Sequence, residues 1–169
     1  MQRVLVIGCS GAGKSTLARV LSEKLQLPLH SLDQMFWQPG WTEPDGKQFA
    51  ARVATVAAEP KWIIEGTFLG HAGEVRRERA EAVIWLDFPR WTCLAGVLTR
   101  TLQNYGRVRF GMAEGCPERF DWEFLRYIWT FNQIQRPGIV EYVARLRPDQ
   151  RLIVLASRRS VTAFLGGKN

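Results

Sequence analysis

The chain has 169 residues, of which 46% are hydrophobic, enough for one domain whose core needs no disulfide or structural metal. No run approaches the ~18 uncharged apolar residues of a membrane span, and the N-terminus enters a strand rather than a signal peptide, so we expect a soluble, cytoplasmic protein. The net charge is +7, and it is uneven: residues 1–90 carry 11 Lys+Arg against 10 Asp+Glu, whereas residues 91–169 carry 12 against 6.

The basic second half fits two kinds of anionic partner. Arginine outnumbers lysine by 18 to 5, and the planar guanidinium binds phosphate oxygens in pairs. The excess therefore suits a polyphosphate site as well as DNA, and charge alone does not choose between them. Cys9, Cys93 and Cys116 are odd in number and far apart, with only two histidines, so no disulfide framework or zinc site is indicated.

The first predicted elements are an apolar strand at residues 4–7 and a helix from residue 14 to about 26. Between them, residues 8–15 match the phosphate-binding loop G-x-x-x-x-G-K-[ST] in its required setting. The glycines let N–H groups converge on one anion, and the helix N-terminus adds partial positive charge. We expect Lys14 to reach the β- and γ-phosphates of ATP and the Ser15 hydroxyl to bind Mg²⁺. The predicted nucleotide-binding residues are Gly8, Ser10, Gly11, Ala12, Gly13, Lys14, Ser15 and Thr16.

A short second strand is predicted at residues 28–32, and Asp33 follows it. Because ligands gather at the carboxyl ends of parallel strands, Asp33 is a candidate to orient or deprotonate an acceptor hydroxyl, unless it binds a neighbouring amide. Further on, Trp37 and Trp41 flank a Pro-Gly turn, and they either line a substrate pocket or cap the core. We assign residues 33–60 to the acceptor side.

The middle of the chain continues the alternation of helices and strands. Two acidic residues close its strands: Glu65, a weaker catalytic candidate, and Asp87. Asp87 directly follows a buried strand, as a Walker-B carboxylate does, so we predict that it holds Mg²⁺ together with Ser15; the alternative is a helix cap before Pro89. The predicted elements are a helix at 47–59, a strand at 62–64, a short solvated helix within 70–81 and a strand at 82–86.

A helix at 91–103 is followed by residues 104–120, in which glycines and a proline interrupt any periodicity. Such a glycine-rich, arginine-bearing segment is typical of a closing lid, although a basic surface loop fits too. Asp121 is a predicted N-cap for a helix at 122–135; a helix at 137–147, a strand at 151–155 and a helix at 160–165 complete the chain.

Arginines near this lid are candidates to contact the transferring phosphoryl group, where one guanidinium is worth about 10³ or more in rate. Arg126 and Arg136 stand out because an unpaired guanidinium on an apolar helix is costly. The predicted catalytic residues are Lys14, Asp33, Arg100, Arg126 and Arg136, with Arg107 as a nucleotide-binding residue.

Strands alternate with helices five times, which predicts one domain over residues 1–169: a P-loop NTPase of the three-layer α/β/α class, with a five-stranded parallel sheet and a lid. The chain resembles the adenylate-kinase-like group of P-loop kinases, and more closely the bacterial proteins called DNA topology modulation proteins. The similarity is carried by residues 8–15, 32–33, 37–41, 62–66, 86–90, 115–119 and 124–126.

This resemblance implies a kinase core with a mobile lid and ATP as donor, and the family name implies an effect on DNA supercoiling. The chain departs from the family pattern at residues 65–67, where Glu-Gly-Thr replaces Asp-Gly-Asn, and at 109–111, where Arg-Phe-Gly replaces Arg-Pro-Asp. The arginine motif with which adenylate kinases hold a nucleoside monophosphate is not evident. We expect an ATP- and Mg²⁺-dependent kinase for a small-molecule acceptor; the alternatives are a nucleotide-dependent DNA-binding protein and a slow ATPase.

Overall fold

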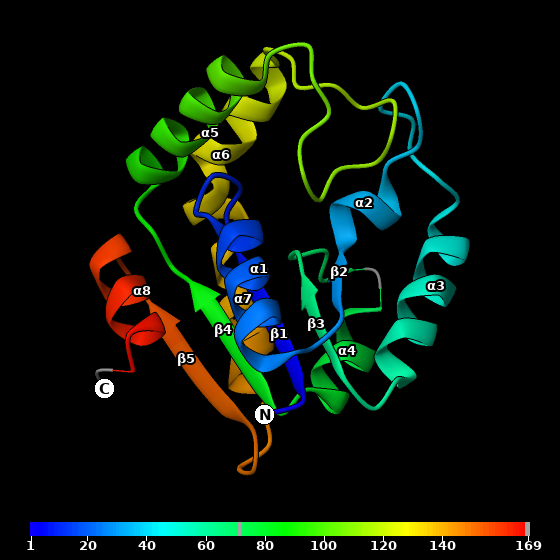
Figure 1. The fold of residues 1–169 in the computed structure, drawn as a ribbon, viewed down its shortest axis with the longest axis vertical. Coiled ribbons are helices and arrows are strands. Elements are labelled where there is room, and N and C mark those ends of the chain that lie inside the picture. Colours follow the sequence, from blue (N-terminus) through cyan, green and yellow to red (C-terminus); the bar gives the residue numbers. More distant parts are fainter. Residues whose placement is uncertain (71, 168–169) are drawn as a thin grey trace.

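The computed structural model describes residues 1–70 and 72–167. One five-stranded sheet with strand order β2-β3-β1-β4-β5 forms its centre, and every neighbouring pair is parallel (Figure 1). The predicted sheet and α/β class are thereby confirmed. The strands are β1 (Arg3–Gly8), β2 (Leu29–Ser31), β3 (Trp62–Glu65), β4 (Ala82–Leu86) and β5 (Arg151–Leu155).

Helices cover both faces of this sheet: in the view of Figure 1, α1 and α8 lie in front of it and α7 lies behind. None of the helices in the described ranges has the length and apolar character that a bilayer crossing requires. The helices are α1 (Lys14–Leu25), α2 (Leu32–Phe36), α3 (Gly46–Ala58), α4 (Gly73–Arg79), α5 (Arg90–Asn104), α6 (Trp122–Ile134), α7 (Arg136–Ala144) and α8 (Arg158–Leu165).

The core sits around the three middle strands. β3 and β4 are buried along their whole length, and β1 is buried from its second residue onward. Such continuous apolar runs are expected where helices cover a parallel sheet on both faces. β5 is an edge strand, and three of its five residues are exposed. The buried centre of the sheet therefore positions the ends of β1 and β3. The phosphate-binding loop begins where β1 ends, and Glu65 is the last residue of β3.

The structure adds one element that the sequence pattern did not predict. β2 ends at Ser31, and the chain turns at once into the five-residue helix α2, so Asp33 lies in the first turn of a helix rather than at a strand end. A helix of this length is too short to show a 3.6-residue period. The predicted N-cap of α6 is confirmed, because the Asp121 carboxylate accepts a hydrogen bond from the Phe124 N–H at 3.0 Å.

Residues 104–120, called the lid segment below, rest on the loop that carries the two tryptophans. Trp37 and Trp41 pack with Met112, Ala113 and Cys116 in a small second apolar cluster, and Trp41 Nε1 donates to a lid carbonyl, Pro117 O, at 3.2 Å. The tryptophans therefore cap a core under the lid segment, which decides between the two alternatives that the sequence left open.

Candidate active site

The loop between β1 and α1 has the backbone shape of an anion-binding cradle. Gly11 and Gly13 have φ angles of +82° and +96°, which side chains rarely tolerate. A Cβ on Gly11 would lie 2.1 Å from the carbonyl oxygen of Cys93 on α5, so only glycine fits there. The loop is thus pressed against α5, and its N–H groups are directed to one place at the start of α1.

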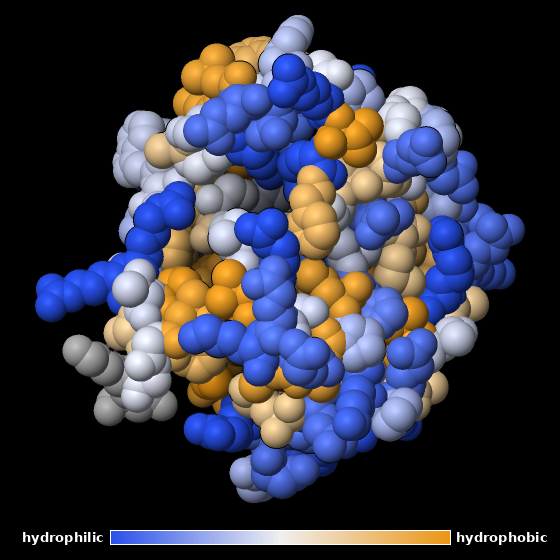
Figure 2. Space-filling model, in the orientation of Figure 1, coloured by the Kyte–Doolittle hydropathy of each residue, from blue (hydrophilic) through white to orange (hydrophobic). Residues whose placement is uncertain are grey.

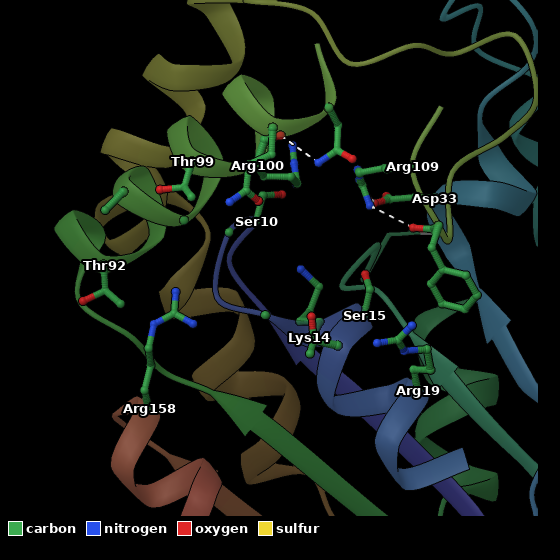
Figure 3. Close-up of a pocket in the computed structure, with 18 of the residues that line it drawn as sticks. Ser10, Lys14, Ser15, Arg19, Asp33, Thr92, Thr99, Arg100, Arg109 and Arg158 are labelled. Carbon is green, nitrogen blue, oxygen red and sulfur yellow. Dashed lines mark hydrogen bonds and ion pairs between the residues drawn. The ribbon is translucent and has the colours of Figure 1, made fainter. Parts of the chain in front are cut away.

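Above this loop lies an open cavity of about 860 Å³, lined by α1, α5, Asp33, the lid segment and the first residue of α8 (Figure 3). Figure 2 shows the same face of the molecule, where hydrophilic side chains border the hollow from above and apolar ones lie beside and below it. The charged and hydroxyl side chains that line it are Ser10, Lys14, Ser15, Thr16, Arg19, Asp33, Thr92, Thr99, Arg100, Arg109 and Arg158.

Most of the nucleotide-binding residues predicted within residues 8–16 line this cavity, namely Ser10, Gly11, Gly13, Lys14, Ser15 and Thr16. Two residues of this loop do not. Gly8 packs against Leu86 of β4, so its contribution is to let the strand end approach closely, and Ala12 is buried beneath the loop. The Lys14 ammonium donates to the Cys9 carbonyl oxygen at 3.1 Å, which curls the side chain back over the cradle.

Glu65, at the end of β3, is the carboxylate that meets the start of α1. Its Oε1 accepts a hydrogen bond from Ser15 Oγ at 3.0 Å and lies 2.8 Å from Ser31 Oγ. The side chain is almost fully buried, and this burial raises the pKa of Glu65, although the charge of Lys14 opposes the rise. A serine hydroxyl of the cradle and a carboxylate of the adjacent strand are thus already in contact.

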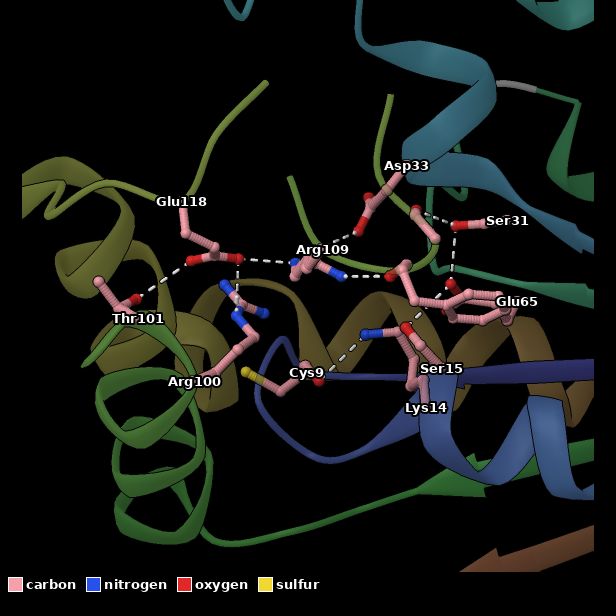
Figure 4. A network of polar contacts seen from close by, with 12 residues as sticks. Cys9, Lys14, Ser15, Ser31, Asp33, Glu65, Arg100, Thr101, Arg109 and Glu118 are labelled. Carbon is pink, nitrogen blue, oxygen red and sulfur yellow. Dashed lines mark hydrogen bonds and ion pairs between the residues drawn. The ribbon is translucent and has the colours of Figure 1, made fainter. Parts of the chain in front are cut away.

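Asp33 and two arginines lie on the other side of the cavity (Figure 4). Asp33 Oδ2 is 3.5 Å from Nη2 of Arg109, which comes from the lid segment. Arg109 and Arg100 of α5 both form ion pairs with the carboxylate of Glu118, with N–O distances of 2.6 and 2.9 Å. Two cationic side chains are therefore held opposite Lys14.

The structure pairs Asp87, the predicted Mg²⁺ ligand, with Arg136 rather than with Ser15. Both oxygens of Asp87, beyond the end of β4, accept hydrogen bonds from Arg136, at 2.9 and 2.8 Å. Neither residue lines the cavity, so the predicted catalytic role of Arg136 is not supported either. β1 has two neighbouring strands, β3 and β4, and the carboxylate that reaches Ser15 comes from β3.

Two further predicted arginines lie outside the cavity. Arg126 is exposed because α6 turns Ile128 and Phe131, rather than Arg126, into the core. Arg107 is exposed in the turn that starts the lid segment. Arg76, on α4 after β3, does not face the cavity either: it is fully buried and donates to the carbonyl oxygens of Gly66, Thr67 and Phe68.

Sequence reasoning missed Arg19 and Arg158, which carry no motif. Arg158 begins α8, just beyond the carboxyl end of β5. The rule that pointed to Asp33, that ligands meet the carboxyl ends of parallel strands, would also have found it. Arg19 lies on α1 one turn beyond Ser15 and stacks its guanidinium 5.7 Å from the ring of Phe110 in the lid segment, a contact that only the folded lid reveals.

No protein-family profile and no curated protein sequence matches the chain. Among solved structures, it is similar to a shikimate kinase from Acinetobacter baumannii in complex with shikimate, with 15% identity and a TM-score of 0.61 over 99% of this chain and 90% of that one. It is also similar to a gluconokinase from Sinorhizobium meliloti 1021, with 16% identity and a TM-score of 0.56 over 98% and 92%. At such identities the similarity shows the fold alone, a three-layer α/β/α arrangement.

Proposed function

We propose that the chain is an ATP- and Mg²⁺-dependent phosphotransferase that moves the γ-phosphoryl group to a hydroxyl of a small molecule. The observation that carries this proposal is the cavity itself: the phosphate cradle with Lys14 lies on one side, and Asp33 with Arg100 and Arg109 lies on the other. Both solved structures named above are kinases, and one of them holds a small hydroxyl-bearing acid, which supports the same class of reaction.

The donor side fits a nucleoside triphosphate. The glycine cradle leaves room for the phosphates, and Lys14 neutralises charge between the β- and γ-groups. Mg²⁺ prefers oxygen ligands and keeps several waters, so the Ser15 hydroxyl, backed by the Glu65 carboxylate 3.0 Å away, suits it. When bound, the metal neutralises the developing charge on the phosphoryl oxygens.

On the acceptor side, Asp33 orients the attacking hydroxyl and takes up its proton. Its carboxylate reaches the cavity from α2 and is kept in place by Arg109. Arg100 and Arg109 stabilise the charge on the transferring phosphoryl group. Arg19 is a further cation on this cavity, and it favours an acceptor that carries negative charge in addition to its hydroxyl.

A screen for ADP release above the rate without acceptor tests this function. The candidates are sugars, small hydroxy acids, nucleosides and nucleotides, and a phosphorylated product distinguishes a kinase from a slow ATPase. The Asp33→Asn variant keeps the shape of the side chain, so we expect it to bind ATP normally but to lose about 10²-fold or more of the acceptor-dependent rate. ADP release that no acceptor raises, with free phosphate as the product, would contradict the proposal.

A further inference from the structure

One buried carboxylate, that of Glu118, joins the lid segment to α5. Its side chain is 4% exposed. Oε1 accepts a hydrogen bond from Nε of Arg109 at 2.6 Å and lies 2.9 Å from Nε of Arg100, while Oε2 accepts a hydrogen bond from Oγ1 of Thr101 at 3.1 Å (Figure 4). A single side chain thus faces two guanidiniums that come from different parts of the chain.

Glu118 contacts both arginines at Nε and leaves their terminal nitrogens to the cavity. Within the described residues, no hydrogen bond leaves the Nη atoms of Arg100, and the Nη atoms of Arg109 reach only Phe110 O and Asp33 Oδ2, each at 3.5 Å, the outer limit of a hydrogen bond. A guanidinium binds phosphate oxygens best through two parallel N–H donors. The terminal nitrogens of both arginines are therefore available to an anion.

The positive charges of Arg100 and Arg109 repel each other, and the carboxylate of Glu118 offsets this repulsion. Burial lowers the pKa of Arg100, and the neighbouring charge of Arg109 lowers it further, whereas Glu118 opposes both effects. Like charges at such close range repel strongly away from bulk water. Removing the carboxylate would therefore let Arg109, on the lid segment, move away from Arg100, on the helix.

We propose that Glu118 is a positioning residue for phosphoryl transfer, which holds Arg100 and Arg109 side by side so that their terminal nitrogens meet the last phosphate of the bound triphosphate. This inference rests on the proposed function. The inference adds that the lid segment responds to the terminal phosphate through Glu118. The carboxylate of Glu118 positions Arg109 of the lid segment and also pairs with Arg100 of α5.

The test compares dissociation constants for Mg·ADP and for the non-hydrolysable triphosphate Mg·AMP-PNP, measured by calorimetry on the full chain. Their ratio isolates the terminal phosphate. In Glu118→Gln, which keeps the shape but removes the charge, we expect the preference for the triphosphate to fall about 10-fold, which corresponds to the loss of one charge-assisted contact. The affinity for ADP should change less than about 2-fold, because ADP lacks the terminal phosphate.

The matched control is Glu114→Gln, which makes the same charge change at an exposed position of the same lid segment; it should keep the wild-type ratio. In an Arg100→Met, Arg109→Met background, Glu118→Gln should have no further effect, because it acts through those two side chains. A wild-type ratio in Glu118→Gln, or an equal loss for both nucleotides, would overturn the inference alone. A wild-type chain that binds neither nucleotide would overturn the proposed function as well.

Discussion

At the scale of single residues, Glu65 has the most unusual environment. Its carboxyl is buried between the hydroxyls of Ser15 and Ser31, and the Ser31 hydroxyl is also 2.7 Å from the carbonyl oxygen of Gly111. A hydroxyl has one proton and cannot donate to two acceptors. A protonated Glu65 that donates to Ser31 satisfies all of these groups, and this agrees with the raised pKa that burial gives the side chain.

This environment predicts a pH-dependent gain in stability for Glu65→Gln. Since the pKa of Glu65 is raised in the folded state, its contribution to stability is complete below the unfolded pKa and is lost as the pH rises through the folded pKa. The neutral amide of glutamine does not titrate, so Glu65→Gln does not lose stability in this way. We expect the variant to melt at a higher temperature than the wild type near neutral pH, and the difference to vanish in acid.

Calorimetric melting curves across the pH range, without nucleotide or Mg²⁺, measure this difference. Glu43→Gln is a suitable control, because Glu43 is exposed in the loop before α3. Equal melting temperatures at all pH values, or a variant that is less stable at neutral pH, would contradict a raised pKa of Glu65 in the folded protein.

At the scale of elements, α6 depends on its first turn. Asp121 accepts from the Phe124 N–H and caps the helix that packs against α5. Asp121→Ala should lower the free energy of unfolding by about 1 kcal/mol, the usual cost of losing an N-cap. Urea denaturation measures the change, and Asp121→Asn, which keeps the capping oxygen, should lose only a small part of it. A full loss in Asp121→Asn would assign the effect to the ion pair with Arg119 instead.

The elements also show how far the sequence can be interpreted. The inner strands β1, β3 and β4 were predictable because apolar runs between turn residues mark buried parallel strands. The phosphate-binding loop was predictable because its glycine and lysine spacing is specific to an anion-binding backbone. The sequence did not decide whether Asp87 or Glu65 contacts Ser15. Both residues close buried strands, and only the strand order and local geometry, which depend on long-range packing, show which carboxylate reaches Ser15.

The partners of the arginines were not predictable for a related reason. An arginine on an apolar helix predicts a partner, but not which one: Arg136 pairs with Asp87, whereas Arg126 is exposed to solvent. Arg100, another predicted catalytic residue, lines the cavity. Its partner Glu118 lies 18 residues further along the chain, beyond a segment without periodicity, so no local pattern connects the two.

At the scale of the whole molecule, the excess of arginine divides into two groups. Some arginines line the cavity or are paired with carboxylates, while others, such as Arg107 and Arg126, are exposed. If the first group accounts for the basic character, duplex DNA should bind weakly and lose its affinity steeply with salt. A fluorescence titration at two salt concentrations measures this, and useful affinity near physiological salt would favour the DNA-binding alternative.

The central claim is that residues 8–15 hold the polyphosphate of ATP with Lys14 as its main cation. Titration of Mg·AMP-PNP into the wild type and into Lys14→Ala tests it most directly, with Lys47→Ala, an exposed lysine of α3, as the control. The account predicts that Lys14→Ala loses about 100-fold or more in affinity, since the ammonium makes charge-assisted contacts to two phosphates, and that Lys47→Ala binds as the wild type does. Equal affinity in the wild type and Lys14→Ala would contradict it.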